Sequence, residues 1–301
     1  MKVPNKPEWL RIKPANSTSA GMQKFRDLRV RVKELKLNTV CEEAHCPNMA
    51  ECWSQGTATF MIMGDTCTRG CRFCNVKTGF PNKELDMWEP FGLARAIKEM
   101  NLEYAVVTSV DRDDLVDQGA NHFAKCIEIV KKKSPETLLE VLIPDFGGKR
   151  ELLDIIIAAK PKVIGQNLET VERLTKDVRD VRAGYELTLD VLKYIKEQDP
   201  EIYTKSSLMV GLGETEAEVV EALTDLRKNN VDFLTIGQYL QPSVKHYKLH
   251  EYVKPEQFKQ YEKIALEMGF LYAFCGSFVR SSYKAGEYWL LKRERNNIEN
   301  N

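Results

Sequence analysis

Six of the eight cysteines in this chain of 301 residues lie between positions 41 and 74. They form two groups of three with the spacings C-x4-C-x5-C and C-x3-C-x2-C, namely Cys41, Cys46 and Cys52, then Cys67, Cys71 and Cys74. Structural zinc sites are closed by four protein ligands, whereas reactive metal sites hold three and leave one position open. Iron–sulfur cubanes are usually held by four cysteine thiolates. The spacing therefore predicts two open iron–sulfur clusters.

The overall composition limits the classes of partner. The 44 basic and 44 acidic residues give a formal net charge of zero, which argues against extensive nucleic-acid binding. No apolar run approaches the roughly 20 residues that span a bilayer, and the first residues lack the apolar core of a signal peptide. We therefore expect a cytoplasmic protein with neither a nucleic acid nor a membrane as partner. In a reducing compartment, clustered cysteines are more often metal-binding or catalytic than disulfide-bonded.

A repeating unit must position these cysteines: a short apolar strand, a polar loop and an amphipathic helix. We expect strands at 57–64, 104–109, 138–143, 163–167, 202–210 and 233–237. Helices are expected at 90–101, 119–133, 149–159, 169–179, 184–198, 215–229 and 255–268. Such alternation predicts an α/β fold with a parallel sheet and right-handed crossovers. Six units, where a closed barrel has eight, predict a partial, open (β/α)6 barrel of TIM type.

Polar residues follow several of the predicted strands. In parallel α/β folds, the chemistry gathers at the carboxyl ends of the strands. The second cysteine group follows the first predicted strand, and the charged run Ser109-Val110-Asp111-Arg112-Asp113-Asp114 follows the second. Asn167 and Glu169 follow the fourth. The charged run could be a solvated loop that caps the next helix, or it could hold an amino-acid ligand by its ammonium and carboxylate groups.

Three further patterns each allow two interpretations. His45 could complete a zinc site with the first cysteine group. Gly211-Leu212-Gly213-Glu214 suggests a phosphate-binding turn, but it lacks the lysine of the known loops, and a tight strand-to-helix turn explains it equally well. A helix over 22–35 has an apolar face and many basic residues, including Arg29, Arg31 and Lys33, which favour either a solvated face or docking of an acidic partner.

Several segments, taken in order, closely resemble the lipoyl synthase family of the radical S-adenosylmethionine (SAM) superfamily. They are CEEAHCPNMAECW, GDTCTRGCRFCNV, TSVDRDDL, NLETV, GLGE, FLTIGQYLQPS and RSSY, and the resemblance runs from about Trp9 to Tyr283. The C-x3-C-x2-C motif alone indicates the superfamily. The C-x4-C-x5-C motif together with the late RSSY is far more specific to this family.

The resemblance implies roles for individual residues. Cys67, Cys71 and Cys74 would hold a catalytic [4Fe–4S] cluster whose open iron binds the amino and carboxylate groups of SAM. The first cysteine group would hold an auxiliary [4Fe–4S] cluster, with Ser282 of RSSY as its fourth ligand. Because an alkoxide is a poorer ligand here than a thiolate, this corner is a plausible place for the cluster to open. Candidate contacts to SAM are Ser109, Asp111, Asn167 and Glu169.

The resemblance also implies an activity. A 5′-deoxyadenosyl radical would abstract hydrogen from an octanoyl chain carried on a lysine, and sulfur from the auxiliary cluster would be inserted at C6 and C8. The implied partners are an octanoylated lipoyl-carrier domain, such as an E2 subunit or the glycine cleavage H protein, an electron donor, and an iron–sulfur carrier that rebuilds the cluster. Alternatives are a related enzyme that inserts sulfur into a free small molecule or tRNA, and a non-catalytic zinc protein.

The expected organisation has three parts. Residues 1–56 form an N-terminal extension with the auxiliary cysteines, 57–270 the radical SAM partial barrel, and 271–301 a C-terminal extension with the serine ligand. Both clusters are expected over the same barrel mouth, with Ser282 brought from the C-terminal part to the first cysteine group.

Overall fold

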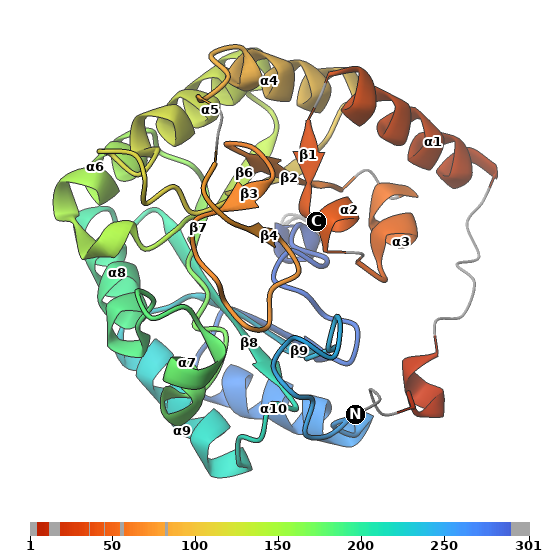
Figure 1. Ribbon diagram of the computed structural model, residues 1–301, viewed down its shortest axis with the longest axis vertical. Helices are drawn as coiled ribbons and strands as arrows, with labels where there is room; N and C mark the ends of the chain where they lie inside the picture. The colour runs from red at the N-terminus through yellow and green to blue at the C-terminus, as the bar shows by residue number, and fades with distance from the viewer. Residues whose placement is uncertain are drawn as a thin grey trace, which may run out of the picture.

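The computed structural model describes residues 5–11, 19–35, 37–44, 46–54, 57–81 and 84–289, and its centre is an eight-stranded sheet (Figure 1). The strands follow the order of the chain: β1 Asn38–Thr39, β2 Thr59–Ile62, β5 Tyr104–Ser109, β6 Leu138–Leu142, β7 Val163–Gly165, β8 Tyr203–Val210, β9 Phe233–Gln238 and β10 Tyr272–Gly276. From β2 onward all neighbours are parallel, and only β1 pairs antiparallel. β1 and β10 are the two edges, so the predicted open barrel is confirmed.

All six predicted strands are present, and the sheet adds β1 at one edge and β10 at the other. β10 pairs in parallel with β9, from Tyr272 opposite Phe233 to Gly276 opposite Gly237. Only Ala273 of β10 is buried, as expected of an edge strand, although Tyr272–Gly276 is an apolar run like those of the inner strands. The sheet therefore continues past residue 270, where the sequence predicted the barrel to end.

The crossover helices cover the outer face of the sheet (Figure 1). They are α4 Glu89–Glu99, α5 Ala120–Lys133, α6 Arg150–Ala158, α7 Glu172–Val178, α8 Tyr185–Gln198, α9 Glu216–Lys228 and α10 Pro255–Glu267. Six begin and end within two residues of the prediction. α7 begins three residues late, because Glu169 has a φ of 68° and forms a bridge with Leu208, which keeps the chain out of helix there. Of the helices described, none is both long enough and apolar enough to cross a membrane.

The first cysteine group lies on two short helices outside the barrel. A 3-10 turn, η1 Glu8–Leu10, precedes α1 Ser19–Glu34, and the cysteines lie on and between α2 Val40–Glu43 and α3 Met49–Ser54. Leu28 and Val32 are buried, as the apolar face of α1 predicts, and Phe25 packs on fully buried Trp53 at 5.6 Å between ring centroids. The residues around Pro47 form a turn between α2 and α3, consistent with the poor fit of proline inside a helix.

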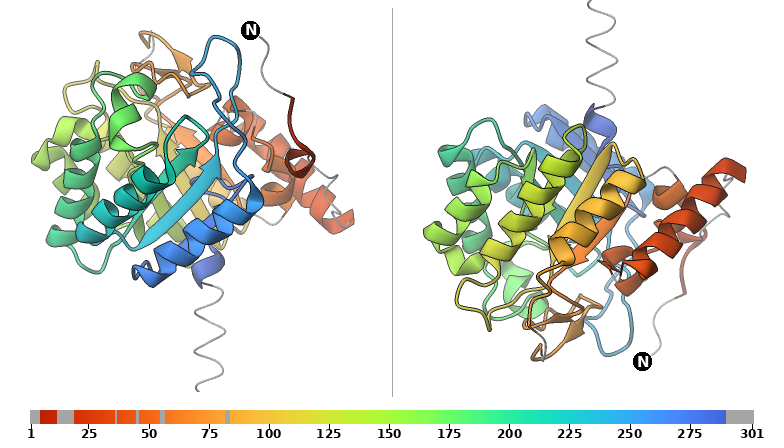
Figure 2. Two further views of the ribbon diagram at one scale, coloured as in Figure 1. Left: turned by 90° about the horizontal axis from the view of Figure 1, so that it is seen from below. Right: turned by 90° about the horizontal axis from the view of Figure 1, so that it is seen from above.

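The two ends of the barrel differ. The loop with the second cysteine group forms a separate two-stranded sheet, β3 Thr66–Cys67 with β4 Lys77–Thr78, at the carboxyl ends of the strands. The last described residues lie at the opposite end (Figure 2). There Tyr288 packs on Phe233 at 4.8 Å and Trp289 on Tyr203 at 5.2 Å, between ring centroids. Aromatic side chains therefore close the amino end, while the carboxyl end carries the cysteine loop.

Candidate functional site

The second cysteine group lies in the loop that follows β2, as the sequence predicted. Backbone N–H groups point at its sulfur atoms: those of Arg69 and Asp111 each lie 3.4 Å from Cys67 Sγ, and that of Asp180 lies 3.3 Å from Cys71 Sγ. A backbone N–H of Val76 also lowers the pKa of Cys74 against the larger effect of burial. Hydrogen bonds to sulfur are among the features that tune iron–sulfur clusters, so this donor set fits a cluster held by the three thiols.

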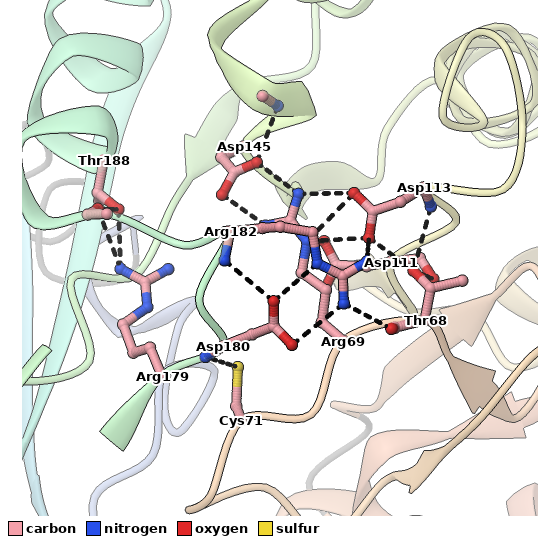
Figure 3. Close-up of polar contacts among 12 residues, drawn as sticks. Thr68, Arg69, Cys71, Asp111, Asp113, Asp145, Arg179, Asp180, Arg182 and Thr188 are labelled. Atoms are coloured by element: carbon pink, nitrogen blue, oxygen red, sulfur yellow. Dashed lines mark hydrogen bonds and ion pairs between the residues drawn. The ribbon is translucent and has the colours of Figure 1, made fainter. Parts of the chain in front are cut away.

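Arg69, between Cys67 and Cys71, joins the loop to two neighbouring strand ends (Figure 3). Its Nη1 and Nη2 lie 2.6 and 2.8 Å from the two carboxylate oxygens of Asp145, which follows β6. Its Nη2 lies 2.9 Å from Asp113 and its Nε 3.3 Å from Asp111, both of which follow β5. The guanidinium is buried and Asp145 is fully buried. Burial alone would lower the pKa of Arg69, but the hydrogen bonds that it donates to Asp145 and Asp113 raise it above its ordinary value.

A second arginine ties the same loop to the segment after α7. Arg182 pairs with Asp180 at 2.8 Å and with Asp113 at 3.2 Å, and its Nη2 donates to the backbone carbonyl of Thr68 at 2.7 Å. The Asp180 carboxylate accepts from the N–H of Gly70 at 2.7 Å (Figure 3). The cysteine loop is thus held on two sides by charge-assisted hydrogen bonds, which are stronger than neutral ones.

The four candidate SAM contacts border this loop. Asp111 Oδ2 lies 3.5 Å from Cys67 Sγ, and burial raises the pKa of Asp111 despite the nearby Arg69. Ser109 Oγ is buried and has no hydrogen-bond partner within the described part of the chain. Asn167 Nδ2 donates to Glu169 at 3.0 Å, and the Glu169 charge acts on Cys74. Asp111 and Glu169 are therefore close to the second cysteine group, and Asn167 contacts it through Glu169.

The alternative reading of residues 109–114 as a solvated helix cap is wrong. Asp111 and Asp113 pair with Arg69 of the cysteine loop, whereas Arg112 pairs with Asp114 within the run. Asp117 instead accepts hydrogen bonds from the N–H groups of Gly119 and Asn121 at the start of α5, at 3.0 and 3.2 Å. The run thus organises the barrel mouth, and a different aspartate caps the helix.

The first cysteine group forms a pocket with residues from the far end of the chain. Its lining comprises Cys41, Cys46, Asn48, Met49, Cys52, Thr57, Thr59, Arg280, Ser282 and Tyr283. Ser282 Oγ accepts a hydrogen bond from Thr59 Oγ1 at 2.7 Å. Asn48 Nδ2 donates to the backbone carbonyl of Phe278 at 2.6 Å, and Tyr283 OH donates to Glu51 at 3.1 Å. The structure therefore brings Ser282 to the three cysteines, as the sequence predicted.

The chemistry of this pocket fits an auxiliary cluster. The indole N–H of Trp53 is buried without a hydrogen bond of normal geometry in the described structure. Burial raises the pKa of Cys41, and the nearby Trp53 N–H offsets a small part of that rise. A thiolate ligand is a stronger acceptor than a thiol and would give this N–H a partner. Three thiols and one hydroxyl supply four donors around one pocket, which matches the number of corners of a cubane.

Burial raises the pKa of the cysteine thiols, to about 12 for Cys52 and Cys67 and to about 11 for Cys71. The structure describes all eight cysteines, and each is a free thiol. Thiols with such raised pKa values keep their protons near neutral pH until a metal displaces them, which couples metal binding to proton release.

A mononuclear metal site receives no support. Among the residues that the structure describes, no three His, Cys, Asp or Glu side chains surround a point where one metal ion could bind. His45, the fourth ligand of the zinc alternative, lies outside the described residues. In a cubane each ligand binds a different iron, so its thiols lie farther apart than the ligands of a single zinc ion.

The two cysteine groups are adjacent, but they lie at different positions along strand β2. Asn75, which follows Cys74, donates from Nδ2 to the backbone carbonyl of Glu43 at the end of α2, at 3.0 Å. The second group follows the carboxyl end of β2, whereas the pocket of the first includes Thr59 at its amino end. The pocket of the first group thus reaches farther along β2 than the loop of the second, and the expectation of two clusters over one mouth stays a prediction.

Sequence reasoning missed the roles of Arg69 and Thr59, and it left the turn at 211–214 open. Nothing in the spacing of Arg69 or Thr59 distinguishes them from ordinary loop and strand residues. In the turn, Glu214 accepts from the N–H groups of Gly211 and Leu212 at 2.5 and 2.9 Å. A carboxylate therefore occupies the amides that a phosphate would need, and the tight-turn interpretation is correct.

Known proteins are similar to this chain in both sequence and fold. A family model described as the radical SAM superfamily matches residues 61–226. Lipoyl synthases of Myxococcus xanthus and of an Anaeromyxobacter strain are 52% and 55% identical, over 96% and 95% of this chain and the same shares of theirs. The lipoyl synthase of Thermus thermophilus is 52% identical over 97% of this chain and 88% of its own length.

Solved structures with little sequence identity share the fold. The hydrogenase maturase HydG of Carboxydothermus hydrogenoformans superposes with a TM-score of 0.57 at 11% identity, covering 91% of this chain and 80% of its own. Methylornithine synthase superposes with a TM-score of 0.53 at 13% identity, covering 85% of both chains. These similarities agree with the open α/β barrel described above.

Proposed function

The chain belongs to the lipoyl synthase family of the radical SAM superfamily, and from this premise we propose which of its residues carry out the reaction. The reaction of this family is the insertion of two sulfur atoms, at C6 and C8 of an octanoyl chain bound to a protein lysine. The cofactors are [4Fe–4S] clusters and SAM. The assignment of cluster ligands to single residues is the proposal.

Cys67, Cys71 and Cys74 hold the catalytic cluster, and Cys41, Cys46, Cys52 and Ser282 hold the auxiliary cluster. When bound, the first supplies the electron that cleaves SAM to a 5′-deoxyadenosyl radical, and the second supplies the sulfur. The observation that carries this assignment is the pocket in which Ser282 meets three cysteines more than 200 positions earlier in the chain. A serine in a cysteine pocket, beside a second and adjacent cysteine group, is what two clusters with different tasks require.

The protein's own contribution is positioning and the exclusion of solvent. Arg69 and Arg182 hold the catalytic cysteine loop against the strand ends, and backbone N–H groups face its sulfur atoms. Ser109, Asp111, Asn167 and Glu169 would supply donors and acceptors for the amino and carboxylate groups of SAM. The aromatic residues at the amino end close the barrel, so a substrate chain enters from the side of the cysteine loop.

The remaining partners and the location follow from the family's chemistry. The octanoylated carrier is a lipoyl domain, of an E2 subunit or of the glycine cleavage H protein. A reductant must supply electrons, and an iron–sulfur carrier must replace the consumed auxiliary cluster. We place the enzyme in the cytoplasm. Residues 1–56 and 271–301 contribute the auxiliary ligands and 57–270 the catalytic ones.

Anaerobic reconstitution with iron and sulfide, followed by a single turnover on an octanoylated lipoyl domain, tests this function. We expect about eight iron atoms per chain, from two four-iron clusters, and mass spectrometry of the carrier should show two added sulfur atoms. Cys67→Ala should abolish release of 5′-deoxyadenosine, while Ser282→Ala should retain it without forming lipoyl product. Formation of 5′-deoxyadenosine by the unaltered enzyme without thiolated carrier would favour a different substrate, and zinc without iron would reject the cluster assignment.

A further inference from the structure

Thr59 contacts two of the residues that surround the auxiliary pocket. Its Oγ1 lies 2.7 Å from Ser282 Oγ, and its backbone N–H faces the Cys41 thiol. Thr59 is only 6% exposed, so bulk water does not compete for these bonds. One residue thus joins a thiol ligand of the N-terminal part to the hydroxyl of the C-terminal part.

Both partners in the Thr59–Ser282 contact are held in place by other bonds. Thr59 is the first residue of β2 and lies opposite Val106 in the parallel ladder with β5. Two hydrogen bonds fix the loop that carries Ser282. Asn48 donates to the Phe278 carbonyl before the serine, and Tyr283 after it donates to Glu51. The contact therefore belongs to a rigid strand and a loop anchored at two points.

From this geometry we propose that Thr59 is a positioning residue for Ser282, holding the serine oxygen at the open corner of the auxiliary cluster. The inference rests on the proposed function, in which Ser282 is a ligand. A serine oxygen bound to iron has lost its proton and can only accept, so the Thr59 hydroxyl must donate to it. This hydrogen bond stabilises the charged oxygen and orients it. Hydrogen-bonding partners behind metal ligands typically contribute about 10- to 100-fold in metal affinity or activity.

The test measures iron release from loaded enzyme without substrate. Thr59→Val keeps nearly the same shape and removes the hydroxyl, whereas Thr59→Ser keeps the hydroxyl. We expect Thr59→Val to release one iron per chain to a chelator about 10- to 100-fold faster than the unaltered enzyme, and to show the electron paramagnetic resonance signal of a three-iron cluster. Thr59→Ser should restore the slow rate. Thr108→Val is the matched control, because Thr108 is also buried but donates to the Leu142 carbonyl on β6.

The Ser282→Ala background separates this inference from the proposed function. If Ser282 is a ligand, its removal alone accelerates loss of one iron, and adding Thr59→Val changes nothing further. If Ser282→Ala leaves iron release and the spectrum unchanged, the proposed function fails. If Ser282→Ala accelerates release but Thr59→Val behaves like Thr108→Val, or acts equally with and without Ser282, the role of Thr59 is overturned and the ligand assignment stands.

Discussion

At the scale of single residues, the contact that organises the catalytic loop is the Arg69 guanidinium among three carboxylates. Asp113 and Asp145 lie 44 and 76 positions from Arg69 in the chain, so no local pattern could reveal them as its partners. The cysteine spacing, in contrast, is local, and it grouped Cys41, Cys46 and Cys52, which line one pocket. Ser282 was predictable in a third way. Its place in the auxiliary pocket could be expected only from a resemblance, because nothing in RSSY alone indicates a metal.

Arg69→Met should destabilise the iron-free protein markedly. Removing one partner of a buried ion pair leaves unpaired charges, which costs about 3–5 kcal/mol in the free energy of unfolding. Denaturant unfolding checks this value, and Arg69→Met/Asp145→Asn should recover part of the loss because it removes one unpaired carboxylate. Arg95→Met is the control, because Arg95 makes only an exposed pair with Glu99. If Arg69→Met were no more destabilising than Arg95→Met, Arg69 would not anchor the loop.

The same substitution should affect one cluster more than the other. Since Arg69 lies between Cys67 and Cys71, Arg69→Met should lower the bound iron from about eight toward about four atoms per chain after reconstitution. The auxiliary ligands lie on other segments and should keep their iron. Equal loss from both sites would indicate general unfolding in place of a local effect.

At the scale of elements, the helices and inner strands could be predicted because their signals are periodic and local. The six inner strands are short and almost fully buried, and their helices show one buried face. β10 was missed although Tyr272–Gly276 is a short apolar run that follows a helix, as the inner strands do. The basic helix α1 remains open to two interpretations. Arg31 pairs with Glu34 and Glu99, both at 2.9 Å, so it is the weakest candidate on that helix for contacting a partner.

We predict that the exposed basic residues of α1 contribute to carrier docking. Replacing Arg26, Arg29 and Lys33 by glutamine should weaken binding of the octanoylated lipoyl domain about tenfold at low salt, at roughly 0.5 kcal/mol per surface charge. The difference should shrink as salt screens the charges. The control removes the same number of positive charges from other helices, by replacing Lys132, Lys133 and Lys259 with glutamine. Equal affinities of the two triple variants at low salt would assign α1 to the solvated surface.

At the scale of the whole molecule, the auxiliary pocket is where the N-terminal helices, the first barrel strand and the C-terminal loop meet. Without metal, few polar contacts link these parts, among them Asn48 with Phe278, Thr59 with Ser282, and Tyr283 with Glu51. A cluster with ligands on two of these parts would join them more firmly. The architecture of the barrel followed from its repeating units, whereas this convergence of distant segments depends on contacts that no sequence period encodes.

Loading the clusters should therefore protect specific segments from hydrogen exchange. We expect amides in 41–54 and 277–283 to become about 100-fold more protected, because binding at 100 times the dissociation constant adds about 2.7 kcal/mol. Amides of α6 and α8, which carry no cluster ligand, serve as the internal reference. Uniform protection across the barrel, or none near Ser282, would contradict the convergence of these segments on a metal site.

The most direct test of the central claim follows sulfur from protein to product. The enzyme is reconstituted with iron and sulfide enriched in sulfur-34, separated from free sulfide, and given the octanoylated lipoyl domain, SAM and a reductant for a single turnover. If the auxiliary cluster supplies the sulfur, both sulfur atoms of the lipoyl product are heavy and Ser282→Ala forms no heavy product. Product that contains only light sulfur would show that the pocket of Cys41, Cys46, Cys52 and Ser282 is not the sulfur source.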